Sequence, residues 1–295
     1  NISYILNSLK LAVTENEKEK TILHIFNSKS VLDGNRIENL PIGLFGDFYS
    51  HELTFFMIGN NDLKNIRKIF NKNNLKVKKI LIKNFIEGIQ LIDQNNNAET
   101  FLKIKINKDK FNINFFDKAS FRYVEYFNFG TSIIFKDIIK VCSINHEIIN
   151  KILSDRSFEN KIFEDNEFLE EKYFIQENYR KIRKKLIVDI ANARIEEIID
   201  IILNKNINMK SFKKKNCKIY IAIEDELIFN NFKGSFRSYC SEDYNFDPYL
   251  INDLEIDSLI TSAANLSIYG WKKEAIPVAQ TKNSLITRIF KSLFE

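Results

Sequence analysis

The chain has 295 residues, of which 44% are apolar and 28% charged, and a formal net charge of +5. This length allows two domains or one large domain with an insertion, and the composition is that of an ordinary globular protein. No stretch approaches 18 uninterrupted apolar residues, and the 3 cysteines lie far apart without a C-x-x-C motif. These features argue against a transmembrane helix, a disulfide framework and a zinc site, and they fit a reducing cytosol.

Lysine, asparagine and isoleucine are abundant along the whole chain, which is typical of proteins from AT-rich genomes. The basic balance is therefore no reason to expect nucleic-acid binding, and we expect no nucleic-acid partner. A net positive charge remains compatible with an anionic membrane surface.

Residues 1–92 predict a helix followed by a small α/β unit. Apolar runs of strand length alternate there with polar turns and short helical patterns. The expected strands span 21–26, 53–59 and 77–82, and the expected helices span 1–12, about 61–70 and 85–92.

The polar run 93–100 is the best candidate for a domain boundary. Beyond it, alternating patterns predict a hairpin and a third strand, followed mainly by helices. The expected strands lie within 101–116, 121–130 and 217–223, and the expected helices span 131–141, 146–153, 169–203 and 256–269. Three consecutive antiparallel strands, then helices and a return strand, is the order of one half of an actin-like (ribonuclease-H-like) fold. We expect an α/β core over 93–272 with an outer helical subdomain at about 144–215.

The end of the chain predicts an amphipathic helix at 284–295, joined to the core by a linker at 273–283. Apolar side chains fill one half of its helical wheel, and cations lie on the other half. The apolar half holds Leu285, Ile286, Ile289, Phe290, Leu293 and Phe294, and the cations are Arg288 and Lys291. This pattern is typical of a helix that lies in the membrane interface. The alternative is a terminal helix that packs on the protein's own core.

Six segments of the sequence, in order, resemble the FtsA family of bacterial actin-like cell-division proteins. They include a Pro-x-Gly-Leu-x-Gly turn, a strand–Asn-Asp–helix unit and the C-terminal amphipathic helix. The segments span 23–47, 56–77, 127–139, 186–202, 261–270 and 284–295. The resemblance implies a small inserted α/β (SHS2-type) subdomain within 1–92. It also implies an actin-like fold that is incomplete at its N-terminus, because the family's first phosphate-binding hairpin has no counterpart here.

The resemblance further implies a peripheral membrane protein at the division septum. Family members tether filaments of the tubulin-like protein FtsZ to the cytoplasmic face of the inner membrane, recruit other division proteins and self-associate. We therefore expect an adaptor, not an enzyme, whose partners are the FtsZ C-terminal peptide, other division proteins and the anionic membrane. The alternatives are an actin-fold ATPase or kinase-type enzyme, and a pilus-assembly-type actin-like scaffold.

The two nucleotide-binding signatures of the family are degenerate in this chain. The phosphate hairpin aligns with Asn107, Lys108, Asp109 and Lys110, and the adenosine loop aligns with Ala222, Ile223 and Glu224. Neither contains a glycine, and Cβ atoms would obstruct a close phosphate approach. We therefore expect no cofactor, although ATP is the family's ligand. The alternative is that Lys108 and Lys110 hold phosphates as point charges.

Arg194 aligns with an arginine that family members use to contact the acidic C-terminal peptide of FtsZ. The alternative is a solvent-facing arginine paired with Glu197, which lies nearly one helical turn away. The basic cluster 180–185 follows the acidic run 164–171. It predicts a self-neutralising solvated surface, with a groove for the FtsZ tail or for a nucleic acid as the alternative.

Overall fold

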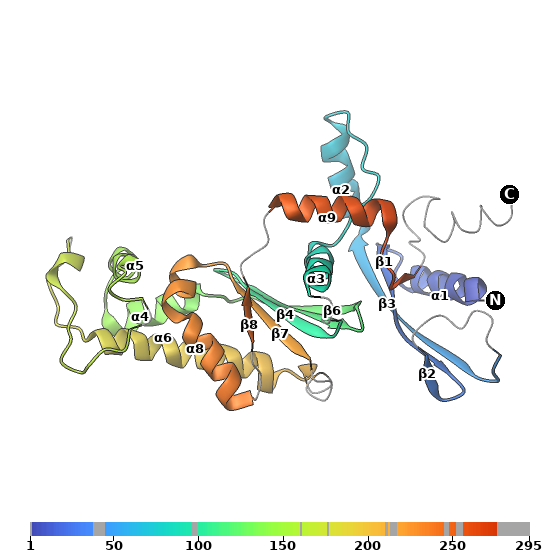
Figure 1. Ribbon diagram of the computed structural model, residues 1–295. Coiled ribbons are helices and arrows are strands. Elements are labelled where there is room, and N and C mark those ends of the chain that lie inside the picture. Colours follow the sequence, from blue (N-terminus) through green and yellow to red (C-terminus); the bar gives the residue numbers. More distant parts are fainter. Residues whose placement is uncertain are drawn as a thin grey trace. The chain divides into compact units, whose positions relative to one another are not determined.

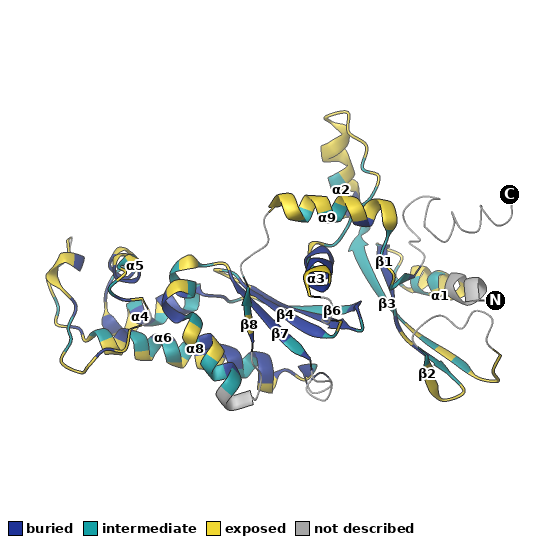
Figure 2. Cartoon of the chain, in the orientation of Figure 1, coloured by how far each residue is buried: buried dark blue, intermediate teal, exposed yellow. Residues whose placement is uncertain are grey.

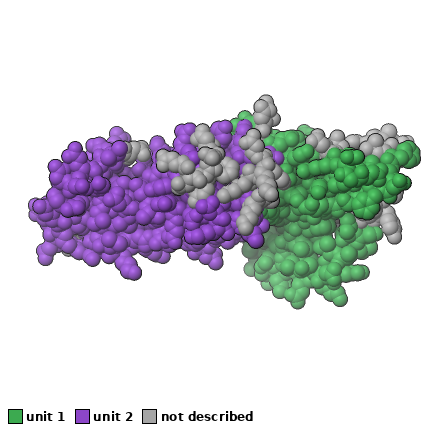
Figure 3. All heavy atoms as spheres, turned by 90° about the horizontal axis from the view of Figure 1, so that it is seen from below, with its two compact units in different colours: residues 1–99, 116–123, 254–295 green, residues 100–115, 124–253 purple. Residues whose placement is uncertain are grey.

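The computed structural model describes most of the chain in two compact units. The described residues are 2–37, 45–95, 99–159, 161–175, 177–209, 212, 217–244, 248–251 and 256–275. Unit 1 consists of residues 1–99, 116–123 and 254–295, and unit 2 consists of 100–115 and 124–253 (Figure 3). No helix in the described part of the chain has the length and apolarity needed to cross a bilayer. The domain ranges 1–92 and 93–272, which follow the sequence order, stay predictions.

Unit 1 contains an antiparallel sheet built on one long strand, β1. The sheet order is β2-β1-β3, and β9 also pairs with β1 (Figure 1). Its strands are β1 (Lys20–Leu32), β2 (Asn35–Ile37), β3 (Tyr49–Gly59) and β9 (Glu274–Ala275). Asp33 and Gly34 both have positive φ angles, of 49° and 80°, which is the backbone that a two-residue Asp-Gly hairpin requires. Residues 274–275, which open the predicted linker, therefore complete this sheet.

Aromatic rings and one histidine form the core of unit 1. The ring centroids of Phe26 and Phe85 lie 4.7 Å apart, and those of Phe56 and Phe121 lie 4.5 Å apart. His24 is fully buried, and its Nδ1 lies 2.7 Å from Glu274 Oε1. This histidine is thus a hydrogen-bonded core residue that connects β1 to the distant β9.

Four helices belong to unit 1, within the part of the chain that the structure describes. They are α1 (Ile2–Asn16), α2 (Asn60–Asn71), α3 (Lys83–Gln94) and α9 (Ile256–Tyr269). Helix α3 is buried from Phe85 to Ile92, and Gln90 Nε2 donates to Ser258 Oγ of α9 at 2.8 Å. The strand predicted at 77–82 is wrong, because residues 75–82 have no regular secondary structure. Ile82 N donates to the side-chain Nε2 of His24 at 3.4 Å, so this end of the segment contacts β1 through a side chain and not through a backbone ladder.

The second sheet has five strands in the order β6-β5-β4-β7-β8. They are β4 (Phe101–Ile106), β5 (Phe111–Asp117), β6 (Ser120–Phe127), β7 (Lys218–Ile223) and β8 (Tyr249–Ile251). The first three follow one another through short turns, whereas β4–β7 and β7–β8 are parallel. Every residue of β4 and β5 is buried, as expected for strands with both faces covered. This order confirms the predicted α/β, actin-like (ribonuclease-H-like) fold class.

The helices of unit 2 confirm part of the prediction and correct the rest. The helices formed by described residues are α4 (Ser132–Cys142), α5 (His146–Ser154), α6 (Lys184–Asp200, continued by a π-helical turn at Ile201–Lys205) and α8 (Glu226–Tyr244). The long helix predicted from 169 to 203 is wrong in its first half, where the described residues form a 3₁₀ turn at Glu171–Tyr173 and no other helix before α6. There the chain pairs with itself, since Leu169 N donates to Ile182 O at 2.8 Å and Lys184 N donates to Glu167 O at 2.9 Å.

Candidate functional site

The two degenerate nucleotide loops meet at one edge of the five-stranded sheet. Strands β4 and β7 are parallel, with Ile106 opposite Ile223, so the loops that follow them start side by side. Glu224 N donates to Ile106 O at 3.0 Å. Ligands of open α/β sheets bind at the carboxyl ends of the strands, which is where this edge lies. The structure thus brings together the segments Asn107–Lys110 and Ala222–Glu224 that the sequence singled out.

The hairpin 107–110 is closed from one side by the start of α4. Thr131 N donates to Asn107 O at 3.0 Å, and Ser132 N donates to Lys108 O at 2.8 Å. A Cβ atom on Gly130 would overlap the Asn107 carbonyl, so only glycine permits this approach. Two of the N–H groups that begin α4 are therefore satisfied by the hairpin itself.

Asp225 is a second closing group, which the sequence analysis missed. Its Oδ1 accepts from Ile228 N at 3.1 Å and caps α8, while its Oδ2 accepts from Thr131 Oγ1 at 3.3 Å. The available signal was an aspartate just before an apolar period of four, which marks a helix start. Asp225 and the neighbouring Glu224 add negative charge to the edge where phosphates would lie.

These loops do not fit a nucleotide triphosphate. The carbonyl groups of Asn107 and Lys108 accept hydrogen bonds from the start of α4, and the carboxylate of Asp225 accepts one from Thr131. Neither loop contains a glycine that would let phosphates approach backbone N–H groups. The side chains of Lys108, Asp109 and Lys110 are exposed. Within the described residues, no group of three His, Cys, Asp or Glu side chains is arranged to hold a metal ion.

Arg194 lies on α6 and joins this helix to α4. Its Nε donates to Asp137 Oδ2 of α4, and its Nη1 donates to Glu197 Oε2. The hydrogen bond to Asp137 raises the pKa of the Arg194 guanidinium. The pairing with Glu197, which the sequence offered as the alternative, is thus present, and a contact with FtsZ stays a prediction.

A groove lies between α4, the start of α6 and the paired segments before it. Residues from all four stretches line it: Val141, Cys142, Asp165, Phe168, Lys181, Ile182, Arg183, Lys185, Leu186 and Asp189. Its apolar part is open to solvent, since Val141 is 59% exposed and Leu186 is 39% exposed. Arg194 is not among the lining residues and lies more than one turn further along α6.

Charged side chains on the rim of this groove contact an aromatic ring and each other. Lys181 Nζ lies 4.4 Å above the Phe168 ring, in cation–π geometry. Lys185 Nζ lies 3.0 Å from Asp165 Oδ1, and this contact lowers the pKa of Asp165 and raises the pKa of Lys185. The basic cluster therefore partly neutralises the acidic run, as predicted, but across two paired segments and not along one helix.

The predicted membrane-binding residues of the tail are not described by the structure. Leu285, Ile286, Arg288, Ile289, Phe290, Lys291, Leu293 and Phe294 all lie outside the described residues. Their role stays a prediction from the sequence.

No protein-family model and no curated protein matches the sequence. Three solved structures illustrate the similarity at the level of the backbone. The ethanolamine utilization protein EutJ from Carboxydothermus hydrogenoformans is 12% identical, with 65% of this chain and 56% of that chain covered and a TM-score of 0.41. MreB5 of Spiroplasma citri bound to AMPPNP is 11% identical, with 71% and 65% covered and a TM-score of 0.46. The PilM-PilN type IV pilus biogenesis complex is 7% identical, with 89% and 70% covered and a TM-score of 0.48.

This chain thus spans less than two thirds of the length of the first two of these structures. All three TM-scores lie below 0.5, which is too low to assign a function to this chain. The fold assignment depends on the order and direction of the strands in the five-stranded sheet.

Proposed function

We propose that this protein is an FtsA-like adaptor of the bacterial division machinery. It binds the acidic C-terminal peptide of FtsZ and attaches to the cytoplasmic face of the inner membrane at the septum through residues 284–295. It also recruits other division proteins, and it does not turn over nucleotide. The observation that carries the proposal is the groove between α4 and α6, supported by the ordered family resemblance.

The groove fits a short acidic peptide with apolar side chains. Val141 and Leu186 offer exposed apolar surface on which such side chains can be buried. Lys181, Arg183 and Lys185 outnumber the carboxylates of Asp165 and Asp189 along the rim. Arginine is suited to a carboxylate because its planar fork donates two parallel hydrogen bonds.

The closed nucleotide loops support an adaptor over an actin-fold ATPase or a kinase-type enzyme. Phosphoryl transfer depends on backbone and cationic groups that surround the transferred phosphate. In this chain the hairpin carbonyls bond α4, and Asp225 bonds Thr131 across the same edge. A pilus-type scaffold is compatible with closed loops but predicts a different peptide partner.

The test is binding of a fluorescent FtsZ C-terminal peptide, measured by polarisation. Leu186→Ser and Arg183→Gln should each weaken binding about tenfold, or 1.4 kcal/mol, without changing the melting temperature. Arg156→Gln is the matched control, because Arg156 is exposed and lies outside the groove. Arg194→Gln tests the second predicted contact; glutamine is used because glutamate would face the carboxylates of Asp137 and Glu197.

Two results would contradict the proposal. Failure of the wild-type protein to bind the FtsZ peptide would contradict the proposed role in division. Full binding by the Leu186 and Arg183 variants would show that the peptide does not bind in the groove. Loss of binding only in Arg194→Gln would place the peptide further along α6.

A further inference from the structure

The end of α2 and the segment after it form a strongly basic projection of unit 1. Residues 60–80 contain seven cations and one carboxylate, Asp62. The cations are Lys64, Arg67, Lys68, Lys72, Lys76, Lys78 and Lys79. We call residues 67–79 the basic tip. Figure 1 shows α2 running outward and the chain returning beside it.

The basic tip also exposes large apolar side chains. Ile69 is 62% exposed, Phe70 is 45% exposed and Leu75 is 57% exposed. Leu63, which lies one helical turn before Arg67, is buried. Every residue from 67 to 76 is exposed (Figure 2). The apolar face of α2 therefore continues past the part of the chain that covers it.

The cations of the tip are not neutralised within the described part of the chain. None of the six cations in 67–79, nor the neighbouring Lys64, has an ion-pair partner among those residues, and Lys79 Nζ lies 3.5 Å from the Leu266 carbonyl. Elsewhere the lysines pair readily, as Lys172 does with Asp155 at 3.0 Å and Lys205 does with Asp200 at 2.8 Å. The positive charge of the tip is thus available to an anionic partner.

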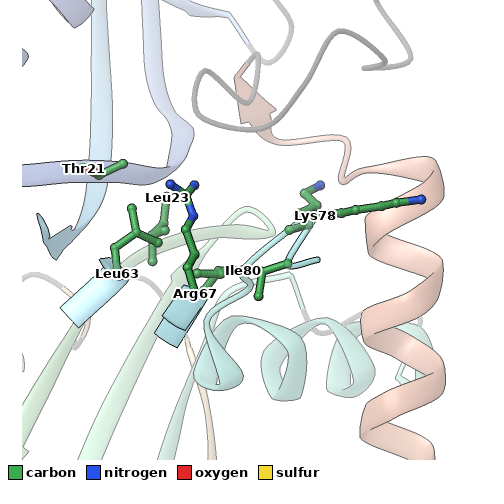
Figure 4. Close-up of a pocket in the computed structure, with 8 residues that line it drawn as sticks. Thr21, Leu23, Leu63, Arg67, Lys78 and Ile80 are labelled. Carbon is green, nitrogen blue, oxygen red and sulfur yellow. The ribbon is translucent and has the colours of Figure 1, made fainter. Parts of the chain in front are cut away.

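A small hollow at the base of the tip adds to this surface. It is lined by Thr21, Leu23, Leu63, Arg67, Val77, Lys78, Lys79 and Ile80, with no carboxylate. Figure 4 shows Arg67 beside Leu23 and Leu63, with Lys78 on the other side of the hollow. Cationic and apolar side chains therefore occur together from the hollow to the end of α2.

We propose that the basic tip docks on an anionic lipid bilayer, as a second membrane contact besides residues 284–295. The proposal rests on the proposed membrane-adaptor function and adds a surface to it. Residues 67–76 are all exposed and project from unit 1, so they present a protruding surface that a bilayer can accept, and the hollow lies only at its base. Phe70, Ile69 and Leu75 enter the interface, and the lysines reach the lipid phosphates, which is the arrangement of interfacial helices.

The experiment is co-sedimentation of the full chain with vesicles, using equal parts phosphatidylglycerol and phosphatidylcholine or phosphatidylcholine alone. A triple variant replaces Lys68, Lys72 and Lys76 with glutamine. Each lysine near an anionic surface strengthens binding about fivefold, so the triple variant should bind anionic vesicles at least roughly tenfold more weakly. The double variant Phe70→Ser, Leu75→Ser should weaken binding as well, because it removes two apolar side chains that enter the interface. Both positions are exposed, so the variant should stay folded.

The matched control has the same net charge, because three exposed lysines elsewhere become glutamine. The control residues are Lys18, Lys136 and Lys151. Both triple variants lower the formal charge from +5 to +2, since each loses three positive charges. Equal loss of binding in both would mean that only net charge matters, and it would overturn the proposal.

A position-specific readout completes the test. The native Cys142, Cys217 and Cys240 are buried, so Leu75→Cys should take an environment-sensitive dye preferentially. The dye should brighten with anionic vesicles and should stay unchanged at the control site Ile162→Cys. No change in the dye at residue 75 would overturn the proposal. A triple variant of Lys68, Lys72 and Lys76 that loses binding to an acidic protein, but still binds anionic vesicles fully, would overturn it too.

Deletion of 284–295 separates the two membrane contacts. A shortened protein that keeps weak binding, sensitive to the Lys68, Lys72 and Lys76 changes, supports the tip. Vesicle binding that does not depend on the tail, together with failure to bind the FtsZ peptide, would contradict the proposed function. It would leave the proposed lipid contact of the basic tip intact.

Discussion

Gly130 lies where the hairpin 107–110 meets α4, and the structure explains why this position holds glycine. An alanine Cβ would overlap the Asn107 carbonyl oxygen, which is backbone and cannot move cheaply. We expect Gly130→Ala to lower the free energy of unfolding by about 1–3 kcal/mol, as overpacking does. Urea denaturation measures this.

Gly234 in α8 provides the control for that substitution. A Cβ there meets no atom within 4 Å, so Gly234→Ala should stabilise the protein by up to about 1 kcal/mol through helix propensity. Equal stability of Gly130→Ala and wild type would show that the hairpin and α4 are not in close contact.

Asp155 makes stability depend on pH in unit 2. Its carboxylate accepts from Tyr173 Oη at 2.7 Å and from Ser157 N at 2.9 Å, and Lys172 Nζ lies 3.0 Å away. The Tyr173 hydrogen bond is the largest cause that holds the pKa of Asp155 well below its usual range. A lowered pKa in the folded state contributes stability above the unfolded pKa of about 4, and this contribution disappears as the pH falls below it.

Tyr173→Phe should therefore destabilise the protein in a pH-dependent way. We expect a loss of about 0.5–1.5 kcal/mol at pH 7, and a smaller loss as the pH falls below about 4. The measurement is urea unfolding of both proteins across this pH range. A difference that does not change with pH would contradict the role of Asp155.

At the scale of elements, local periodicity located most helices and strands but not their extent. Helix α8 buries Ile228, Phe232, Phe236 and Cys240 at a spacing of four, a signal that the sequence analysis left unused. The first half of the predicted helix 169–203 also had helical spacing and charge pairs. There the hydrogen bonds between Leu169 and Ile182 and between Glu167 and Lys184 replaced helical ones.

The tail is the element whose function the sequence predicts most directly. A single helix of this length is only marginally stable in water and buries its apolar face partly, so it should bind lipid weakly and reversibly. Deletion of 284–295, or Phe290→Glu, should lower co-sedimentation with anionic liposomes at least roughly tenfold. Self-associated protein should bind better than monomer, because several tails raise the effective concentration.

Two outcomes would contradict the anchor. Truncated protein that sediments with liposomes as well as the intact chain does would show that the tail is dispensable. Protection of the tail from proteolysis without lipid would indicate that it packs on the protein's own core.

At the scale of the whole molecule, the closed loops predict a protein without a nucleotide cycle. Isothermal titration with Mg-ATP should show no binding tighter than ~100 μM, which corresponds to about 5.5 kcal/mol. Asp225→Ala serves as a comparison, because it removes the negative charge and the bond to Thr131. Saturation of the wild type at low micromolar ATP would favour phosphate binding by Lys108 and Lys110.

The sequence by itself indicated four strands of the five-stranded sheet, β4 to β7, in their chain order, and the two degenerate loops; it did not predict β8. Alternation, turn residues and missing glycines are local properties, so they can be read without the fold. Only the tertiary structure decided how distant segments meet. His24 and Glu274 are 250 positions apart, and Thr131 and Asp225 are 94 apart, yet both pairs are in contact. Such contacts depend on which strand edges and helix ends remain unsatisfied once the chain is packed, and no local pattern records that.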